Sequence, residues 1–267
     1  MSVASVPKVS VIVPVYNASD KFVKCIDTIV NQSLVEIEIV LILDCPSDGT
    51  DEIAKQYAAK DHRIVIIEND ENLHIGESRN KGLKIAKGEY IGFSDHDDFR
   101  ELTMYEVLYN EAKKRDYDIV LGVNIEKKEK EIAQTALPDT LLDSELREFV
   151  LKDLISGGDD VTLSPIFANI HPNLYKNSFL EENNIFFEDT RICTPEDRIF
   201  QIKSVFYASK ISYCQMPLYF HLIHKNSAVN VPSYRNCTYR ANGKVVVWNF
   251  LKEIILLKNI NFFFTNR

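Results

Sequence analysis

Short apolar runs alternate with stretches of helical periodicity along the first 125 residues. Continuous apolar runs rich in β-branched residues predict buried strands at residues 9–14, 37–43, 64–67, 90–93 and 119–122. Between these runs, apolar side chains recur at helical spacing and predict helices near residues 22–30, 51–58, 76–87 and 102–115, the first with Asn17 or Ser19 as its N-cap. Because the strand runs are continuous rather than alternating, we expect an α/β fold with a mostly parallel sheet and helices on both faces.

The alternation weakens after residue 125. Residues 126–131 form a charge run that is typical of a solvated loop or helix end. Beyond it, the pattern predicts helices at residues 142–155, 195–204 and about 243–257, and two short strands near 211–213 and 218–221. No internal repeat and no linker rich in Pro, Gly or Ser forces a domain boundary, so the chain is expected to build one large core or one and a half.

Polar residues follow the predicted strands at the point where each strand ends. Tyr16 and Asn17 come after the first strand, Asp44 after the second, residues 69–70 after the third and residues 95–98 after the fourth. In parallel sheets of this kind, ligands bind outside the carboxyl ends of the strands. We therefore expect these side chains to share one crevice, with Asp44 and the cluster at residues 95–98 in one pocket.

Two separated acidic clusters indicate the chemistry of that crevice. The first is Ser94-Asp95-His96-Asp97-Asp98, and the second is Glu196-Asp197, about a hundred residues further on. Carboxylates packed this closely repel one another unless a cation lies among them, and hard oxygen ligands favour Mg²⁺ or Mn²⁺. A metal that neutralises a phosphate leaving group, together with a remote carboxylate base, suggests group transfer from a nucleotide.

Composition narrows the possible classes of function. The formal net charge of −8 argues against a nucleic-acid-binding protein, because a phosphate backbone demands a basic face. The five cysteines are scattered and lack C-x-x-C spacing, which fits a reducing compartment and argues against a disulfide framework or a zinc knuckle. No signal peptide is evident in residues 1–7, and the apolar stretch at 245–257 is too short and too polar to span a bilayer. We therefore expect a cytoplasmic protein.

Four motifs in order along the chain carry a resemblance to a known family. They are the run from Val9 to Asn17, Asp44-x-x-Ser47-Asp48-Gly49-Thr50, Asn72-x-x-x-Gly76-x-x-Arg79-Asn80-x-Gly82, and the run from Gly88 to Asp98. Together they resemble the inverting glycosyltransferases of family 2, which have the GT-A fold, a Rossmann-like sheet that binds nucleotide-diphospho-sugars. The resemblance is tight over residues 8–98, looser over about 170–228, and absent after about 230.

The resemblance implies roles for residues on the donor side of the site. The residues that would cradle the nucleotide are Pro14, Tyr16, Asn17 and Asp44. Arg79 would lie beside the nucleotide or its phosphates, where a guanidinium matches phosphate oxygens. The chain departs from the family in having one acid, at Leu43-Asp44, where relatives often have two, and Cys45-Pro46 in place of a more usual Gly-Ser pair.

The resemblance also implies a metal site for Mg²⁺ or Mn²⁺. Asp97 would bind the ion directly, and Asp95 would face the ribose or the metal. His96 could add a ligand or merely cap a strand. His224 matches a C-terminal histidine that reaches the metal or the diphosphate in many relatives, and His221 is the competing choice.

Asp197 matches the general base that takes the proton of the acceptor hydroxyl, on the face of the sugar opposite the leaving group, so that the transfer inverts the anomeric carbon. The implied donor is a nucleotide sugar, UDP-linked in our interpretation, and the acceptor is a saccharide or lipid-linked hydroxyl, as in bacterial surface polysaccharide synthesis.

We expect residues 1–125 to bind the donor, 126–230 to carry the acceptor site and the base, and 231–267 to form a helical extension. No Gln-x-x-Arg-Trp motif occurs, which favours addition of a single sugar over processive synthesis.

Each of these sites has a structural alternative. Asp97 and Asp98 could cap the helix that begins near residue 102, and Glu196-Asp197 is a favourable first helical turn. Arg79 could pair with an acid on its own helix, and His171 could line the acceptor pocket. The apolar stretch at 254–264 is compatible with core, a homodimer contact or a peripheral membrane contact, with core as the default. A catalytically silent sugar-nucleotide-binding subunit and a sugar nucleotidyltransferase are the alternative functions.

Overall fold

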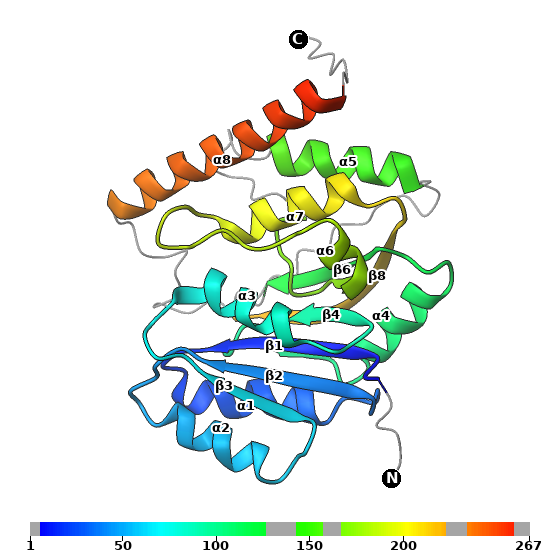
Figure 1. Ribbon diagram of the computed structural model, residues 1–267. Coiled ribbons are helices and arrows are strands. Elements are labelled where there is room, and N and C mark those ends of the chain that lie inside the picture. Colours follow the sequence, from blue (N-terminus) through cyan, green and yellow to red (C-terminus); the bar gives the residue numbers. More distant parts are fainter. Residues whose placement is uncertain (1–5, 127–142, 157–166, 223–233, 259–267) are drawn as a thin grey trace.

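The protein is an α/β structure built around an eight-stranded, mostly parallel sheet, described here by a computed structural model for residues 6–126, 143–156, 167–222 and 234–258 (Figure 1). In sheet order the strands are β3 (Ile64–Glu68), β2 (Ile37–Leu43), β1 (Val9–Val15), β4 (Tyr90–Phe93), β7 (Leu174–Lys176), β6 (Ile119–Glu126), β8 (Ile211–His221) and β5 (Phe99–Arg100). The pairs β3–β2, β2–β1, β1–β4 and β6–β8 are parallel, whereas β7 and β5 pair antiparallel with their neighbours.

Helices cover both faces of the sheet, as the continuous apolar strand runs predicted. One face packs against α1 (Ser19–Val30), α2 (Thr50–Ala58) and α4 (Met104–Lys113). The other face packs against α3 (His74–Ile85), α5 (Asp143–Ser156), α6 (Asn177–Glu182) and α7 (Glu196–Tyr207). The last helix, α8 (Tyr234–Lys258), lies on the outside of this second layer, above α5 and α7 in Figure 1. Strand β1 shows the reason for burial on both sides, since Val9, Val11 and Val13 point into the first layer and Ile12 into the second.

The sequence predictions for β1 to β4, β6 and α1 to α4 are confirmed to within a few residues, whereas β5, β7 and α6 were not predicted. The two short strands expected at 211–213 and 218–221 are one strand, β8, which continues through exposed Met216 and Pro217, opposite a register shift in β6. Neither Asn17 nor Ser19 caps α1: the N-cap is Ala18, and the side chain of Asn17 accepts a hydrogen bond from Ser47 N at 2.8 Å instead.

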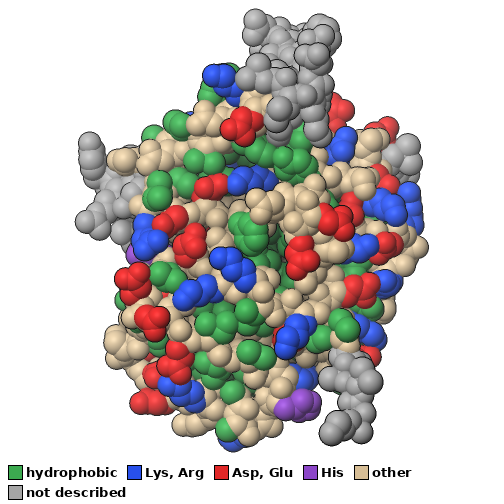
Figure 2. Space-filling model, viewed as in Figure 1, with side chains coloured by type: hydrophobic (Ala, Val, Ile, Leu, Met, Phe, Trp, Pro, Cys, Tyr) green, Lys and Arg blue, Asp and Glu red, His purple; other side chains and the backbone are tan. Residues whose placement is uncertain are grey.

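The last helix begins earlier than predicted. Helix α8 starts at Tyr234, and Gly243, taken as the first helical residue, lies within it. A Cβ at Gly243 would come within 2.3 Å of the carbonyl oxygen of Thr194, so the glycine allows α8 to approach the loop before α7 closely. No helix in the described ranges is long and apolar enough to cross a membrane. On the face shown in Figure 2, acidic and basic side chains are intermixed, without a continuous basic surface.

Candidate functional site

The carboxyl ends of the central strands meet at one edge of the sheet, and the residues that follow them extend its hydrogen bonding. Asp44 N donates to Val15 O at 2.9 Å, Asn69 N to Leu43 O at 2.9 Å, and Ser94 N to Ile12 O at 3.0 Å. The residues that follow β1, β2, β3 and β4 therefore lie side by side. This is the edge at which the strand pattern placed the crevice.

A buried arginine joins three acidic side chains at this edge. The side chain of Arg79, on α3, is 1% exposed. Its Nη2 atom lies 3.0 Å from Asp95 Oδ1, and its Nη1 atom lies 3.3 Å from Glu196 Oε1 and in close contact with Asp197 Oδ1. Asp95 follows β4 and the other two acids open α7, so Arg79 connects the strand ends to a helix more than a hundred residues away in the chain.

His171 completes this cluster. Its Nε2 atom lies 3.0 Å from Arg79 Nη2 and 3.1 Å from Asp95 Oδ1, and its Nδ1 atom contacts Asn169 Oδ1. The histidine is buried, and it contacts the Asp95 carboxylate directly. Sequence reasoning placed His171 only in an acceptor pocket, and the structure places it against the first acidic cluster.

Burial and mutual repulsion set the protonation of the cluster. Burial, followed by the charge of Asp197, raises the pKa of Glu196 to about 8, although Arg79 opposes the shift. Burial alone would raise the pKa of Asp95, but the charges and hydrogen bond of His171 and the charge of Arg79 outweigh it and hold that pKa well below its usual range. Burial would lower the pKa of His171, yet the neighbouring Asp95 raises it. At neutral pH, the Glu196 carboxyl group therefore carries a proton.

The local sequence around Arg79 explains how α7 reaches the strand ends. Asn80 Nδ2 donates to Phe187 O at 3.0 Å, and Phe187 N donates to Asn80 Oδ1 at 2.9 Å. A Cβ at Gly76 would lie 2.3 Å from Glu188 O, so only glycine permits this approach. The motif from residue 76 to residue 82 thus docks the loop that precedes α7 onto α3, which brings Glu196 and Asp197 to Arg79. Arg79 pairs with acids from other elements rather than with an acid on its own helix.

The predicted nucleotide-side residues form a second group at the same edge. Asp44 is buried, and its Oδ1 accepts hydrogen bonds from Asn69 Nδ2 and Leu73 N, both at 2.7 Å. Pro14 O lies 3.2 Å from His96 Nδ1, while Tyr16 is 45% exposed. These contacts tie the end of β1 to that of β4, and the end of β2 to the turn after β3. Asp44 contacts the turn after β3 and not the acidic cluster, so the two groups adjoin along the edge without a shared ion pair.

The carboxylates of the first acidic cluster differ in their surroundings. Asp97 and His96 are partly exposed, whereas Asp98 is buried. Asp98 does not cap α4, whose N-cap is Thr103 and has no side-chain hydrogen bond. Its carboxylate instead accepts hydrogen bonds from the Tyr219 hydroxyl at 2.6 Å and from Leu222 N at 2.9 Å. Tyr219 lies in β8, and Leu222 follows that strand directly.

The chemistry of Asp95 and Asp97 fits a hard divalent cation. In the part of the chain that the structure describes, no group of three His, Cys, Asp or Glu residues is placed to hold a metal, and His224 lies outside that part. Mg²⁺ typically binds proteins through one or two carboxylates, with water and substrate phosphates as its other ligands. Asp95 and Asp97 offer carboxylates of the kind that such an ion takes, and Asp95 Oδ1 is already engaged by Arg79 and His171.

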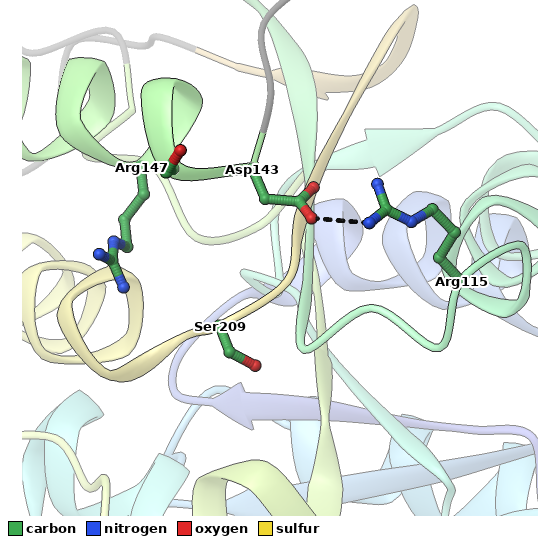
Figure 3. Close-up of a pocket in the computed structure, with 5 residues that line it drawn as sticks. Arg115, Asp143, Arg147 and Ser209 are labelled. Atoms are coloured by element: carbon green, nitrogen blue, oxygen red, sulfur yellow. Dashed lines mark ion pairs between the residues drawn. The ribbon is translucent and has the colours of Figure 1, made fainter.

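The cavity in Figure 3 lies away from this edge. It has a volume of about 350 Å³ and is lined by Arg115, Asp143, Ser144, Arg147 and Ser209. Arg115 and Ser209 lie just before β6 and β8, which run parallel to β4, so the cavity is at the amino ends of the strands. Its charged groups are paired at the surface: Arg115 Nη2 lies 3.1 Å from Asp143 Oδ2, with 59% of the arginine side chain exposed. We assign the site to the opposite edge because the charges there are buried.

Comparisons with known proteins agree with this architecture. The family described as "Glycosyl transferase family 2" matches residues 10–191. The chain is 31% identical over 228 residues to "Uncharacterized glycosyltransferase EpsJ" of Bacillus subtilis, covering 85% of this chain and 64% of that protein. It is 34% identical over 222 residues to the "Poly(ribitol-phosphate) beta-glucosyltransferase" of Bacillus spizizenii, covering 82% of this chain and 33% of that protein.

Solved structures share the fold at lower sequence identity. The structure of S. aureus TarS 1-349 in complex with UDP-GlcNAc has a TM-score of 0.69 at 23% identity, covering 85% of this chain and 61% of TarS 1-349. The mannosyltransferase PcManGT from Pyrobaculum calidifontis, in complex with GDP-Man and Mn²⁺, has a TM-score of 0.60 at 15% identity, covering 84% of this chain and 59% of the other. The chain thus spans from a third to about two thirds of the length of these proteins.

Proposed function

This chain belongs to glycosyl transferase family 2 and has the GT-A fold, and from that premise we propose that it transfers a single sugar from a UDP-linked donor to a hydroxyl group of a saccharide or lipid-linked acceptor, with inversion of the anomeric carbon. The observation that carries the proposal is the Arg79 cluster. It fixes a carboxylate of the strand-end loop, Asp95, and a carboxylate of α7, Asp197, on the same buried guanidinium. A donor-side group and a candidate base are thereby held at one place.

Asp197 is the member of the acidic pair that suits a general base. The pKa of Glu196 is raised to about 8 by burial and by Asp197, so its carboxyl group is occupied by a proton at neutral pH. The side chain of Asp197 is 24% exposed, twice the 12% of Glu196, and can reach a substrate. A positioned carboxylate that accepts the hydroxyl proton contributes about 10²–10⁴-fold to such a step.

On the donor side, we propose that Asp97 and Asp95 hold Mg²⁺ or Mn²⁺ together with the diphosphate, with His224 as a further ligand. When bound, the ion would stabilise the negative charge that develops on the leaving nucleoside diphosphate. Pro14, Tyr16, Asn17, Asp44 and His96 would contact the nucleoside, since they line the same edge. The burial of Arg79 supports a role in holding Asp95 and Asp197, in place of the direct phosphate contact expected from the sequence.

The relatives support a place in bacterial surface polymer synthesis. The Bacillus spizizenii relative is described as acting on poly(ribitol-phosphate), and TarS is seen with UDP-GlcNAc. We propose a UDP-hexose or UDP-N-acetylhexosamine as donor on this basis. Because the chain covers only part of those proteins, the acceptor is proposed as a class, a polymer or lipid-linked hydroxyl.

A panel of nucleotides tests this function. Thermal unfolding is followed with UDP, GDP, CDP and ADP, each with and without Mn²⁺. A nucleotide that binds the folded protein and is present at 100 times its Kd should raise the free energy of unfolding by about 2.7 kcal/mol. We expect the largest shift with UDP and Mn²⁺, and slow release of UDP from its hexose conjugates. The Asp97→Ala variant should lose both effects. The control is Asp116→Asn, which should keep both, because Asp116 is an exposed residue just before β6 that pairs only at the surface with Lys176. Binding of a nucleotide without sugar release in the wild type would identify a silent binding subunit instead.

A further inference from the structure

Tyr219 is a fully buried tyrosine near the end of β8 whose hydroxyl contacts both ends of the first acidic loop. The hydroxyl donates to Asp98 Oδ2 at 2.6 Å and accepts a hydrogen bond from Asp95 N at 3.4 Å. One oxygen atom therefore joins the first and the last residue of the segment that holds Asp95, His96 and Asp97. Through this contact, β8 restrains both ends of the segment from Asp95 to Asp98.

The ring of Tyr219 supports the same loop from two further directions. It stacks on the ring of His171, with centroids 5.4 Å apart and an interplanar angle of 15°, and His171 in turn contacts the Asp95 carboxylate. The guanidinium of Arg100 lies 5.4 Å from the centroid of the Tyr219 ring, and its Nη2 atom donates to Ser94 Oγ at 2.7 Å. Tyr219 thus restrains the main chain of Asp95 directly and its carboxylate through His171.

Asp98 links this arrangement to the end of β8. Besides the Tyr219 hydroxyl, its carboxylate accepts a hydrogen bond from Leu222 N at 2.9 Å, and only 1% of the residue is exposed. A buried carboxylate needs such donors, because an unsatisfied charged group in the interior is costly. The hydroxyl therefore meets the requirement of Asp98 and at the same time fixes the loop around Asp97.

We propose that Tyr219 is a positioning residue whose hydroxyl sets the geometry of Asp95 and Asp97 for the cation and the diphosphate. The inference rests on the proposed function, since it holds that the Tyr219–Asp98 hydrogen bond serves the binding of the nucleotide-sugar donor. Tyr219 touches neither acceptor nor base in this account. Its loss should weaken the binding of nucleotide and cation by the folded protein.

The chain offers a matched control for this distinction. Tyr90, in β4, is also fully buried, and its hydroxyl donates to Tyr117 O at 3.1 Å near the amino ends of the strands. Tyr219→Phe and Tyr90→Phe each remove one buried hydroxyl and keep the ring. Both variants should lower Tm, Tyr219→Phe by more because it leaves the buried Asp98 carboxylate with one donor fewer, and only Tyr219→Phe should change ligand binding.

The measurement is calorimetric titration of UDP in saturating Mn²⁺, and of Mn²⁺ in saturating UDP, for the wild type and both variants. We expect Tyr219→Phe to raise both Kd values about tenfold, the loss typical of one hydrogen bond to a charged group, and Tyr90→Phe to leave them unchanged. Asp98→Asn changes the other partner of the same hydrogen bond and should also raise both Kd values. This variant replaces Tyr219→Phe as the test if Tyr219→Phe does not fold. Unchanged Kd values in whichever of these two variants folds, or equal changes in the Tyr90→Phe control, would overturn the inference alone. A wild type that binds no UDP would instead overturn the proposed function on which it rests.

Discussion

The two edges of the sheet both carry charged side chains, and they differ in how those charges meet water. At the amino ends of the strands, ion pairs are exposed: Arg115 with Asp143 at 3.1 Å and Lys113 with Glu89 at 2.6 Å have exposed fractions of 59% and 43% on their basic side chains. At the carboxyl ends, the Arg79 side chain is 1% exposed and meets Asp95, Glu196 and Asp197. Exposed pairs contribute about 0–1 kcal/mol to stability, whereas removing one partner of a buried pair costs about 3–5 kcal/mol.

The difference teaches where function lies in this molecule. Charged groups held around a buried guanidinium are expensive to maintain, and such clusters concentrate at functional sites. The amino-end edge has the cavity of Figure 3 but no buried charge in its lining, and the carboxyl-end edge has the buried charges. If this contrast is sound, equivalent substitutions at the two edges should have very different effects.

The largest difference is expected for activity. Asp197→Asn removes the proposed base and should lower the rate of UDP release from a UDP-hexose by about 10²–10⁴-fold, with the Kd of UDP unchanged. Asp143→Asn, the same change in the wall of the amino-end cavity, should leave the rate unchanged. The rates are measured by coupled detection of UDP. A fully active Asp197→Asn variant would remove Asp197 from the mechanism.

The next difference concerns stability. Arg79→Ala removes a buried cation that three partly exposed acids share and should lower the free energy of unfolding by about 3–5 kcal/mol, whereas Arg115→Ala removes an exposed partner of Asp143 and should cost about 0–1 kcal/mol. Urea unfolding at pH 7 measures both values. Equal losses of unfolding free energy in the two variants would show that the Arg79 cluster is solvated and that the two edges do not differ in this respect.

A third test uses the dependence of stability on pH. Burial and the charge of Asp197 raise the pKa of Glu196 from 4.5 to about 8. The folded protein then binds a proton that the unfolded chain has lost, so this residue makes stability fall as pH rises from about 4.5 to about 8. Glu196 faces Arg79 on α3, Asp197 on its own helix and Cys193 in the preceding loop, and Asp95 and His171 share the same arginine.

Glu196→Gln keeps the neutral shape of the protonated acid and should remove that part of the slope. The quantity to compare is the difference in unfolding free energy between wild type and variant, measured from pH 5 to pH 8, because the other titrating groups cancel in it. We expect the variant to gain stability relative to the wild type as pH rises. A difference that stays constant over this window would place Glu196 in its ordinary ionised form.

The smallest effect is expected at the amino-end cavity. Arg147 Nη1 donates to Ala208 O at 3.1 Å, and the cavity has no contact with the Arg79 cluster among the described residues. Arg147→Ala should change donor turnover by less than about twofold, the range of a surface substitution outside a site. A larger loss of UDP release would mean that the cavity takes part in substrate binding and that burial is a poor guide to function here.

The sequence predicted the fold and the edge of the site because both follow from local patterns. Continuous apolar runs identify β1, β2 and β4, and the polar residues at their ends must then lie together. The surroundings of Arg79 could not be predicted in this way. Its burial depends on the clamp between Asn80 and Phe187, and its acids come from α7, so the partners are separated by more than a hundred residues.

The contacts of Tyr219 were missed for the same reason. A buried tyrosine in a strand reads as core, and nothing local pairs it with Asp98, 121 residues earlier. His171 carried a weak signal, because its position in the loop-like run Asn169-Ile170-His171-Pro172 was the only argument for a role in the site. His224 and its proposed role fall outside the described residues, so that prediction stays as the sequence made it.

The central claim is that the Arg79 cluster sets Asp197 against the face of the sugar opposite the nucleotide, and the stereochemistry of donor hydrolysis tests it most directly. Proton NMR can follow the sugar first released from an α-linked UDP-hexose by the wild type with Mn²⁺, before mutarotation, and by Asp197→Asn. The account predicts that the wild type releases the β-anomer first and that the variant releases none above background. Initial release of the α-anomer, or β-anomer formed equally fast by Asp197→Asn, would contradict it.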